Sequence, residues 1–481
     1  MADSKRPNII LIITDQQRYE TINALGYSYM STPHLDRLAR EGTTFTQCHI
    51  TAPSCAPSRA SLFTGNYPHD TGVWRNGDIW PRSWVQDLHD GGYYCANIGK
   101  MHTNPFDDDI GFDERWVVEN KDRFLGGKAY TDYKDEWDKA FIREGRTKPS
   151  RPVYRQYPDY RERMGAFVWP LEDEMQSDMY VGNKATAWLR EYAPSDQPYF
   201  LEVGLPGPHP PYDPPQRFLD LYRGKKLPWR RTDPADVAGQ PKPLQQLREH
   251  NFEVDHDSVV HLDDPTDEQL KHLWEHYLAN VSAIDEQVGA IIAEVEARGE
   301  ADNTIIMFTS DHGEALGDHG HIQKWTMYES VTRVPLIVWG PGHVTAGQTR
   351  DGLCALMDVG ASILDWAGVT PEVPMQAQSL RSATTDTGWT GRDYVIAEHG
   401  RDMFLHDIDE VMMLRTTRWK WVSFDDGACG QLFDLQSDPE ENHNLWNDPR
   451  AATQRTALAQ AAACARRNDE QQAAERLSAL T

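Results

Sequence analysis

Long apolar segments are missing from this sequence of 481 residues. The apolar run from Ile9 to Ile13 is far shorter than the ~20 residues that a helix needs to cross a bilayer. The mean hydropathy of -0.66 also argues against a membrane protein. The segment from Met1 to Pro7 contains no hydrophobic signal region. We therefore expect a cytoplasmic protein that has no membrane partner.

Paired cysteines and an excess of positive charge are also missing. The six cysteines are widely spaced and form no CxxC pair, which argues against a disulfide framework or a zinc site. The 48 Lys and Arg residues are outnumbered by 74 Asp and Glu, so the formal net charge is -26. Because affinity for nucleic acid depends on clustered Lys and Arg, this charge argues against a nucleic-acid partner.

The chain contains enough hydrophobic residues to form a large core. Hydrophobic residues make up 39% of it, and it has 16 Trp. Its length exceeds the size at which one core usually stops growing, so we expect two domains.

Strand and helix patterns alternate along most of the chain. The unbroken apolar run 8–13 is typical of a strand buried on both faces of a parallel sheet. Further strands are predicted at 93–98, 199–203, 304–309 and 336–339.

The clearest helix begins at Thr266, where Gln269 completes a capping box, and ends at Gly299. Shorter helices are predicted at 32–42 and 357–368. This alternation predicts an α/β sandwich with a large, mainly parallel sheet flanked by helices.

The pattern changes near residue 370. We predict a catalytic α/β domain over 1–370 and a smaller C-terminal α+β subdomain with an antiparallel sheet over 371–481. A terminal helix is predicted from Ala451 onward. The polar stretch 121–178 is interpreted as an insertion, of the kind that often lines a substrate pocket. The strands of the subdomain are predicted from short alternating runs at 411–414, 419–424 and 431–433.

Five polar residues come just after predicted strands: Asp15, Lys100, His209, Asp311 and His312. Ligands of open α/β sheets gather outside the carboxyl ends of the strands, so we expect these side chains at one edge. Carboxylates and imidazole are common ligands of divalent cations. The sequence therefore predicts a metal site at this edge.

The segment Cys55-Ala-Pro-Ser-Arg59 is the feature of the sequence that points most specifically to a function. Taken alone, it also fits a helix start that carries a small buried thiol. Continued to Gly65, it resembles the active-site signature of type I sulfatases, within the alkaline phosphatase superfamily. The resemblance implies that a formylglycine-generating enzyme acts on the chain and oxidises Cys55 to formylglycine, the precursor of the nucleophile.

The resemblance covers nearly the whole chain. Lys100 and His102 match a Gly-Lys-x-His segment, His209 matches a Pro-His segment, and Lys324 follows Asp-His-Gly-His. The segments 415–420 and 432–440 resemble the last strand and loop of sulfatases, and 121–178 is least covered. The implied fold is an alkaline phosphatase-like sandwich with a smaller C-terminal subdomain.

The two residues after the first predicted strand differ from the family pattern. Type I sulfatases usually carry two consecutive aspartates there, whereas this chain has Asp15-Gln16. A similar opening occurs in phosphonate monoester hydrolases of the same superfamily. The implied ligands of one divalent ion are Asp15, Gln16, the modified Cys55, Asp311 and His312. Their reduced negative charge favours Mn²⁺ over Ca²⁺, and either of these over Mg²⁺ or Zn²⁺.

The resemblance also implies a role for each basic residue. One hydroxyl of the hydrated aldehyde, bound to the metal, attacks sulfur, while Lys100, Lys324, Arg59 and His209 neutralise charge on the sulfuryl oxygens. Either His209 or Lys324 protonates the leaving oxygen. His102 is the candidate base that takes the proton of the second hydroxyl, so that sulfate leaves by C–O cleavage and the aldehyde is regenerated, and Arg59 orients the diol.

The leading interpretation is a formylglycine-dependent sulfatase, a homodimer, that hydrolyses small aryl or alkyl sulfate monoesters and cross-reacts with phosphoryl esters. One alternative is a phosphonate monoester hydrolase or phosphodiesterase with the same site. Asp15-Gln16 favours this alternative, and Ser58 disfavours it, because those enzymes usually carry alanine there. The other alternative is a non-catalytic pseudoenzyme that keeps the fold.

Overall fold

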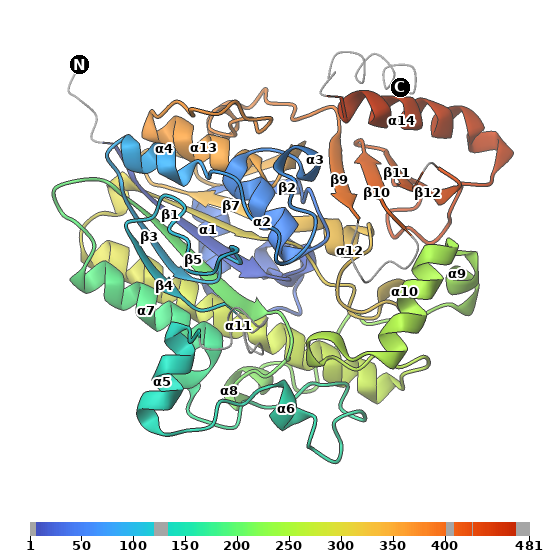
Figure 1. Ribbon diagram of the computed structural model, residues 1–481, viewed down its shortest axis with the longest axis horizontal. Coiled ribbons are helices and arrows are strands. Elements are labelled where there is room, and N and C mark those ends of the chain that lie inside the picture. The colour runs from blue at the N-terminus through green and yellow to red at the C-terminus, as the bar shows by residue number, and fades with distance from the viewer. Residues whose placement is uncertain (1–5, 120–132, 401–407, 426, 468–481) are drawn as a thin grey trace.

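The structure, a computed structural model, describes residues 6–119, 133–400, 408–425 and 427–467. Two sheets organise it, a large one at the centre and a small one near the C-terminus (Figure 1). The large sheet contains β1 (Asn8–Asp15), β2 (Thr43–His49), β3 (Tyr94–Gly99), β4 (Glu114–Val117), β5 (Tyr199–Pro208), β6 (Thr304–Ser310), β7 (Arg333–Trp339) and β8 (Gln348–Ala355). The small sheet contains β9 (Val395–His399), β10 (Val411–Arg415), β11 (Trp419–Phe424) and β12 (Cys429–Asp434).

Helices cover both faces of the large sheet and fill the connections between strands (Figure 1). Those before β5 are α1 (Pro33–Glu41), α2 (Cys55–Thr64), α3 (Pro68–Thr71), α4 (Val85–Asp90), α5 (Glu136–Glu144), α6 (Arg151–Tyr154) and α7 (Ser177–Glu191). Those after β5 are α8 (Gln216–Leu219), α9 (Pro234–Gly239), α10 (Lys242–Glu253), α11 (Asp267–Ala297), α12 (Glu329–Thr332), α13 (Asp358–Ala367) and α14 (Ala452–Ala465).

Strand β1 is buried on both faces, as its unbroken apolar run predicts. Ile9 and Leu11 pack with side chains of α2, α4 and α13 on one face. Ile10 and Ile12 pack with side chains of α1, α7 and α11 on the other. The chain therefore forms the predicted sandwich, with helical layers on either side of one sheet.

The large sheet runs in the order β4-β3-β5-β1-β6-β7-β2-β8 and is mainly parallel. Strand β7 is the exception, because it pairs antiparallel with both β6 and β2. After β6 the chain does not cross back over the sheet through a long helix. It runs irregularly from Asp311 to Tyr328, makes the single turn of α12, and re-enters the sheet from the same edge. This return keeps the whole segment 311–328 at the carboxyl edge of β1 and β6.

Helix α11 begins with the predicted capping box. The Thr266 hydroxyl accepts a hydrogen bond from the Gln269 backbone nitrogen at 3.2 Å, and the Gln269 side chain accepts one from the Thr266 nitrogen at 2.9 Å. The helix is the longest secondary-structure element of the described chain. In the part of the chain that the structure describes, no helix is long and apolar enough to cross a membrane.

The C-terminal region forms the predicted antiparallel sheet, in the order β12-β11-β10-β9. Helix α14 lies along it, and the expected continuation of this helix over 468–481 lies outside the described residues (Figure 1). The division of the chain at residue 370 remains our proposal.

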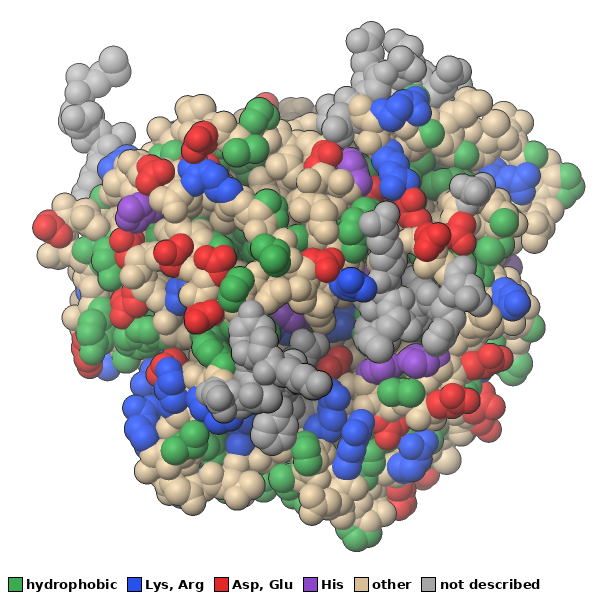
Figure 2. Space-filling view, viewed as in Figure 1, with side chains coloured by type: hydrophobic (Ala, Val, Ile, Leu, Met, Phe, Trp, Pro, Cys, Tyr) green, Lys and Arg blue, Asp and Glu red, His purple; other side chains and the backbone are tan. Residues whose placement is uncertain are grey.

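Part of the expected insertion is helical. Within 133–178 the chain forms α5, α6 and the start of α7, whereas 121–132 lies outside the described residues. Figure 2 shows Lys and Arg side chains gathered over α5 and α6, in the lower part of the view. The exposed basic side chains of this segment include Arg143, Arg146, Arg155, Arg161 and Arg163. Three of these arginines pair with carboxylates, Arg146 with Glu172, Arg161 with Asp255 and Arg163 with Asp159, so the basic group is partly neutralised.

A buried ion cluster joins the small sheet to the catalytic region. Lys420 of β11 is fully buried, and its Nζ lies 2.7 Å from both Glu329 Oε1 of α12 and Glu441 Oε1. It also donates a hydrogen bond to the Met327 carbonyl oxygen at 2.9 Å. Burial acts to raise the pKa of Glu329, but Lys420 and Arg415 outweigh it and hold this pKa well below its usual value.

We predict that Lys420→Met destabilises the protein by about 3–5 kcal/mol, because Glu441 loses the buried cation that pairs with it and Glu329 keeps only the longer contact with Arg415 at 3.5 Å. Urea unfolding measures the loss. The matched control is Arg418→Met, two residues earlier, whose half-exposed ion pair with Asp434 is worth at most about 1 kcal/mol. Equal losses in the two variants would contradict this account of the cluster.

Candidate active site

Helix α2 presents Cys55 at its N-terminus. Ser54 is the N-cap, Cys55 is the first helical residue, and Gly65 ends the helix in the left-handed conformation with φ of 72°. Every residue of α2 is buried, and the Cys55 side chain is 1% exposed. The free backbone N–H groups of the first turn and the helix dipole make this end electropositive. The predicted helix start is therefore present, and it carries the cysteine into the interior.

Four possible ligand atoms meet beside the cysteine. One atom each of Asp15, Cys55, Asp311 and His312 lies within 4.8 Å of all the others, and all four residues are buried. Cys55 Sγ is 3.3 Å from His312 Nε2 and 3.7 Å from Asp15 Oδ1. The parallel pairing of β1 with β6, in which Thr14 lies opposite Ser310, brings the two aspartates together.

The donor set fits a divalent cation. Each carboxylate gives one oxygen to a cationic side chain and turns the other toward His312 Nε2, at 3.8 Å for Asp15 and 3.7 Å for Asp311. His312 Nδ1 lies 2.8 Å from the Gly313 carbonyl oxygen, so Nδ1 carries the proton and the Nε2 lone pair is available to a metal. Four of the five predicted ligand residues thus converge.

Three basic side chains surround these donors. Lys324 Nζ lies 3.0 Å from Cys55 Sγ, and Lys100 Nζ pairs with Asp15 Oδ2. Arg59 is fully buried, and its Nε donates to Asp311 Oδ2 at 2.7 Å. Its Nη1 donates to the Lys100 carbonyl oxygen at 2.6 Å. Arg59 therefore contacts a candidate metal ligand and the strand end that carries Lys100.

This concentration of charge shifts pKa values. Burial alone acts to raise the pKa of Asp15, but Lys100, His209 and Lys324 hold it well below its usual range. Burial and Asp15 also act to raise the pKa of Cys55, and the lysines outweigh them, so this pKa is lowered. The pocket is thus arranged to stabilise an anion at the position of the cysteine side chain.

Gln16, the fifth predicted ligand, is held by a carboxylate that sequence reasoning did not assign to the site. Its Nε2 donates to Glu314 Oε2, and its Oε1 accepts from Lys324 at 3.1 Å. Glu314 is fully buried and also accepts from the Tyr212 hydroxyl at 2.8 Å. The sequence signal that could have found Glu314 is its place in the segment Ser310-Asp-His-Gly-Glu314, only two residues after His312.

The two remaining histidines lie at the ends of neighbouring strands. His209 directly follows β5; its Nδ1 is 2.8 Å from the Pro210 carbonyl oxygen, and its Nε2 is 3.5 Å from Asp257 Oδ2. Burial and Lys324 lower the pKa of His209, and Asp15 and Asp257 oppose them. His102 lies beyond β3 with φ of 68°, and its backbone nitrogen donates to Glu119 at 3.0 Å. No pattern in the sequence pointed to Asp257 or Glu119.

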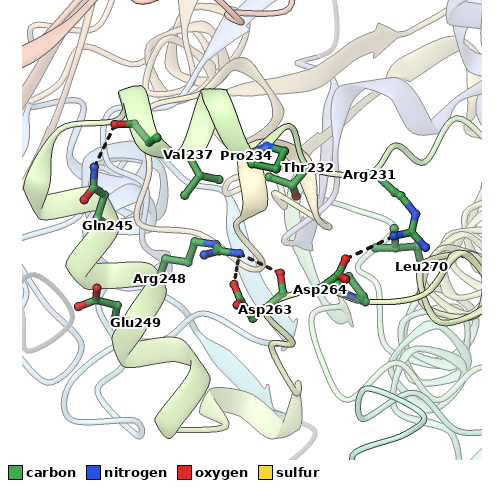
Figure 3. Close-up of a pocket in the computed structure, with 12 residues that line it drawn as sticks. Arg231, Thr232, Pro234, Val237, Gln245, Arg248, Glu249, Asp263, Asp264 and Leu270 are labelled. Carbon is green, nitrogen blue, oxygen red and sulfur yellow. Dashed lines mark hydrogen bonds and ion pairs between the residues drawn. The ribbon is translucent and has the colours of Figure 1, made fainter.

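A large cavity among the described residues lies away from this site (Figure 3). It has a volume of about 620 Å³ and lies between α9, α10 and the start of α11. Its charged side chains face one another, since Arg248 pairs with Asp263 and Arg231 with Asp264. None of the predicted site residues lines it, so cavity size does not identify the reaction site here.

Comparison with known families agrees with this geometry. Residues 7–369 match the family described as "Sulfatase", and residues 317–468 match "N-sulphoglucosamine sulphohydrolase, C-terminal". The chain belongs to the sulfatase family. Sulfatases hydrolyse sulfate esters, so the predicted family and enzyme class, sulfuric ester hydrolase, are confirmed.

Curated relatives of this sulfatase cover nearly its full length. It is 30% identical over 463 residues to an arylsulfatase of Clostridium perfringens, covering 92% of this chain and 90% of the relative. It is 28% identical over 471 residues to a choline-sulfatase of Rhizobium meliloti, covering 94% and 85%.

Solved structures confirm the fold of the sulfatase. A phosphonate monoester hydrolase of Silicibacter pomeroyi superposes with a TM-score of 0.79 at 23% identity, covering 96% of each chain. A structure in complex with its substrate D-glucosamine-2-N,6-O-disulfate superposes with a TM-score of 0.75 at 22% identity, covering 98% of each chain.

We predict that chelation abolishes ester hydrolysis by this sulfatase and that Mn²⁺ restores it. Binding of Mn²⁺ to the folded state alone raises its stability by about 2.7 kcal/mol at a hundredfold excess over Kd, which a thermal-unfolding scan detects. Asp311→Asn removes one anionic donor and should abolish this stabilisation. Asp365→Asn, at a half-exposed ion pair with Arg381, is the control and should keep it. Stabilisation of both variants by Mn²⁺ would place the metal elsewhere.

Proposed function

We propose that this protein hydrolyses small aryl or alkyl sulfate monoesters, with formylglycine made from Cys55 and one divalent cation, Mn²⁺ or Ca²⁺, at the four-donor cluster. The observation that carries the proposal is the position of Cys55 Sγ, which lies against His312 and Lys324 at the N-terminus of α2. When bound, the metal would make a hydroxyl of the hydrated aldehyde more acidic and so a better nucleophile.

Other side chains of the site would neutralise charge, hold the carboxylates in place and transfer protons. Lys324 faces both Cys55 and Gln16, so it would neutralise charge beside the nucleophile. Lys100 and Arg59 pair with Asp15 and Asp311, and would hold these carboxylates in place before substrate binds. His102, near the end of β3, would serve as the base that regenerates the aldehyde.

We assign His209 as the residue that donates a proton to the leaving oxygen. In an in-line displacement the leaving oxygen lies opposite the attacking atom, and Lys324 is already directed at the position of the attacking atom. His209 directly follows β5, whereas Lys324 lies in the irregular segment after β6, and Nε2 of His209 faces Asp257 rather than Cys55. A proton on that nitrogen would pass to the oxygen as the sulfur–oxygen bond breaks.

The basic side chains over α5 and α6 support an anionic substrate. A protein with a formal net charge of -26 repels a sulfate ester at long range, and the exposed arginines of the insertion, several of them paired with carboxylates, would reduce this repulsion only locally. A formylglycine-generating enzyme would act during maturation. Cross-activity toward phosphoryl esters, a homodimer and a cytoplasmic location stay as proposals from the sequence.

A second candidate function, phosphonate monoester hydrolysis, rests on Gln16 and on the fold. Gln16 occupies the position at which the resemblance to phosphonate monoester hydrolases was noted, and two such enzymes superpose on this chain. A non-catalytic role is the remaining alternative. The mass of the tryptic peptide that contains Cys55 tests it, since a wholly unmodified thiol would support a pseudoenzyme.

We predict that Cys55→Ser turns over sulfate esters slowly at best and accumulates a sulfated serine. Serine has one hydroxyl, so water must attack sulfur to release the product. Single-turnover kinetics and the mass of the peptide measure this. Cys95→Ser, which changes another buried cysteine, is the matched control and should keep full turnover. Normal steady-state turnover by Cys55→Ser would exclude the aldehyde mechanism.

The substrate class is tested by kcat/KM for 4-nitrophenyl sulfate beside an aryl phenylphosphonate, on Mn²⁺-loaded protein with confirmed formylglycine. We expect a sulfate preference of tenfold or more, which corresponds to about 1.4 kcal/mol of transition-state stabilisation. The opposite preference would identify the protein as a phosphonate or phosphodiester hydrolase.

A further inference from the structure

A strained turn lies next to the candidate acid His209. This turn is the short 3-10 helix His256–Ser258. It contains two consecutive non-glycine residues in the left-handed region, Asp257 with φ of 52° and Ser258 with φ of 64°. Such conformations cost free energy and persist where surrounding contacts fix them, which is common at functional sites. The turn was not recognised from the sequence.

Contacts from two separate parts of the chain hold this turn. From the insertion, Arg151 Nε donates to the Ser258 hydroxyl at 3.2 Å. At Gly165, an added Cβ would come within 2.0 Å of the Ser258 carbonyl oxygen, so only glycine allows this approach. From the segment that carries Lys324, the Gln323 side chain donates to the His256 carbonyl oxygen at 2.8 Å.

The turn directs the two oxygens of Asp257 to different partners. Oδ1 lies 3.1 Å from Arg151 Nη2, and Oδ2 lies 3.5 Å from His209 Nε2. The other nitrogen of His209 faces the Pro210 carbonyl oxygen at 2.8 Å. Both nitrogens of the imidazole therefore face acceptors, which fixes the plane of the ring.

We propose that Asp257, fixed by Arg151 of the insertion, is a positioning residue that holds the His209 imidazole in the orientation needed for proton donation to the leaving oxygen. The proposal rests on the proposed function, in which His209 supplies this proton. In the imidazolium form of His209, Nδ1–H faces the Pro210 carbonyl oxygen and Nε2–H faces Asp257. As the bond between sulfur and the leaving oxygen breaks, that oxygen keeps the electron pair and accepts the proton from Nε2, which leaves a neutral imidazole protonated on Nδ1. Asp257 stays a carboxylate throughout and accepts the same N–H before substrate binds.

This arrangement gives the insertion a role in catalysis as well as in substrate binding. Arg151 follows the irregular connection after α5 and does not contact the four-donor cluster through any described hydrogen bond or ion pair. Its effect on the reaction would pass through the turn that carries Asp257. A leaving group that needs no proton should therefore be insensitive to both residues.

The test is the dependence of kcat/KM on the leaving group. A series of sulfate esters is used, from 4-nitrophenyl sulfate, whose phenoxide leaves readily, to phenyl and simple alkyl sulfates. For Asp257→Asn we expect a loss of at least a hundredfold with the poorest leaving groups and less than tenfold with 4-nitrophenyl sulfate, because general-acid catalysis is worth about 10²–10⁴. The loss should lie in kcat rather than in KM.

Arg151→Gln supplies a second, independent variant. Its losses should show the same dependence on the leaving group, and the double variant Arg151→Gln/Asp257→Asn should lose little more than Asp257→Asn alone. The matched controls are Asp255→Asn and Arg161→Gln, a pair that also joins the 255–258 region to the insertion but does not face His209. Both controls should keep the wild-type leaving-group dependence.

Equal losses across the whole series, or losses that simply add in the double variant, would overturn the proposal and leave Asp257 a purely structural residue. Unchanged activity in Asp257→Asn would overturn it as well. The outcome is separable from the proposed function. If wild-type protein prefers phosphonate esters, the same variants are compared on aryl and alkyl phosphonates, where the positioning role predicts the same pattern.

Discussion

The burial of two neighbouring carboxylates is the constraint on which the rest of the structure depends. One oxygen of each carboxylate faces a cationic side chain, and the other faces the four-donor cluster. Burying Asp15 and Asp311 side by side would cost several kcal/mol for each charge if no partner compensated it. Lys100 and Arg59 provide the compensation on one side. The other oxygen of each carboxylate is left for the donor cluster. The register of β1 against β6 sets this spacing, so the sheet itself fixes the site.

The features that the sequence could predict are those with a local signal. A polar residue directly after a buried run identified Asp15, Lys100, His209 and Asp311, and the parallel sheet brings them to one edge. The capping box at Thr266 gave the start of α11, because its hydrogen bonds involve residues only three apart. Local patterns were sufficient for both.

Features that depend on distant contacts could not be predicted in this way. The antiparallel direction of β7 follows from the path of the chain along the edge of the sheet, and the run 336–339 does not encode it. The clamp of Glu314 on Gln16 joins residues almost 300 positions apart. The turn at Asp257 is fixed by the insertion and by Gln323, and neither contact leaves a periodic pattern.

The irregular segment 311–328 is fastened at both ends, and this explains why a long loop can hold Lys324 in place. Near its start, Glu314 accepts hydrogen bonds from Gln16 and from the Leu316 backbone nitrogen. Near its end, Lys420 of the small sheet binds the Met327 carbonyl oxygen. The C-terminal sheet thus anchors the loop that carries Lys324, although its own residues do not belong to the four-donor cluster.

The burial of α2 limits when a modifying enzyme could reach the Cys55 thiol. Each of its ten residues is enclosed, and the Cys55 thiol has almost no contact with solvent. An enzyme that recognises an extended Cys-x-Pro-x-Arg peptide could not reach it once the sheet has closed around the helix. If Cys55 is oxidised as we propose, the oxidation would come before folding. A molecule that folded first would then keep its cysteine.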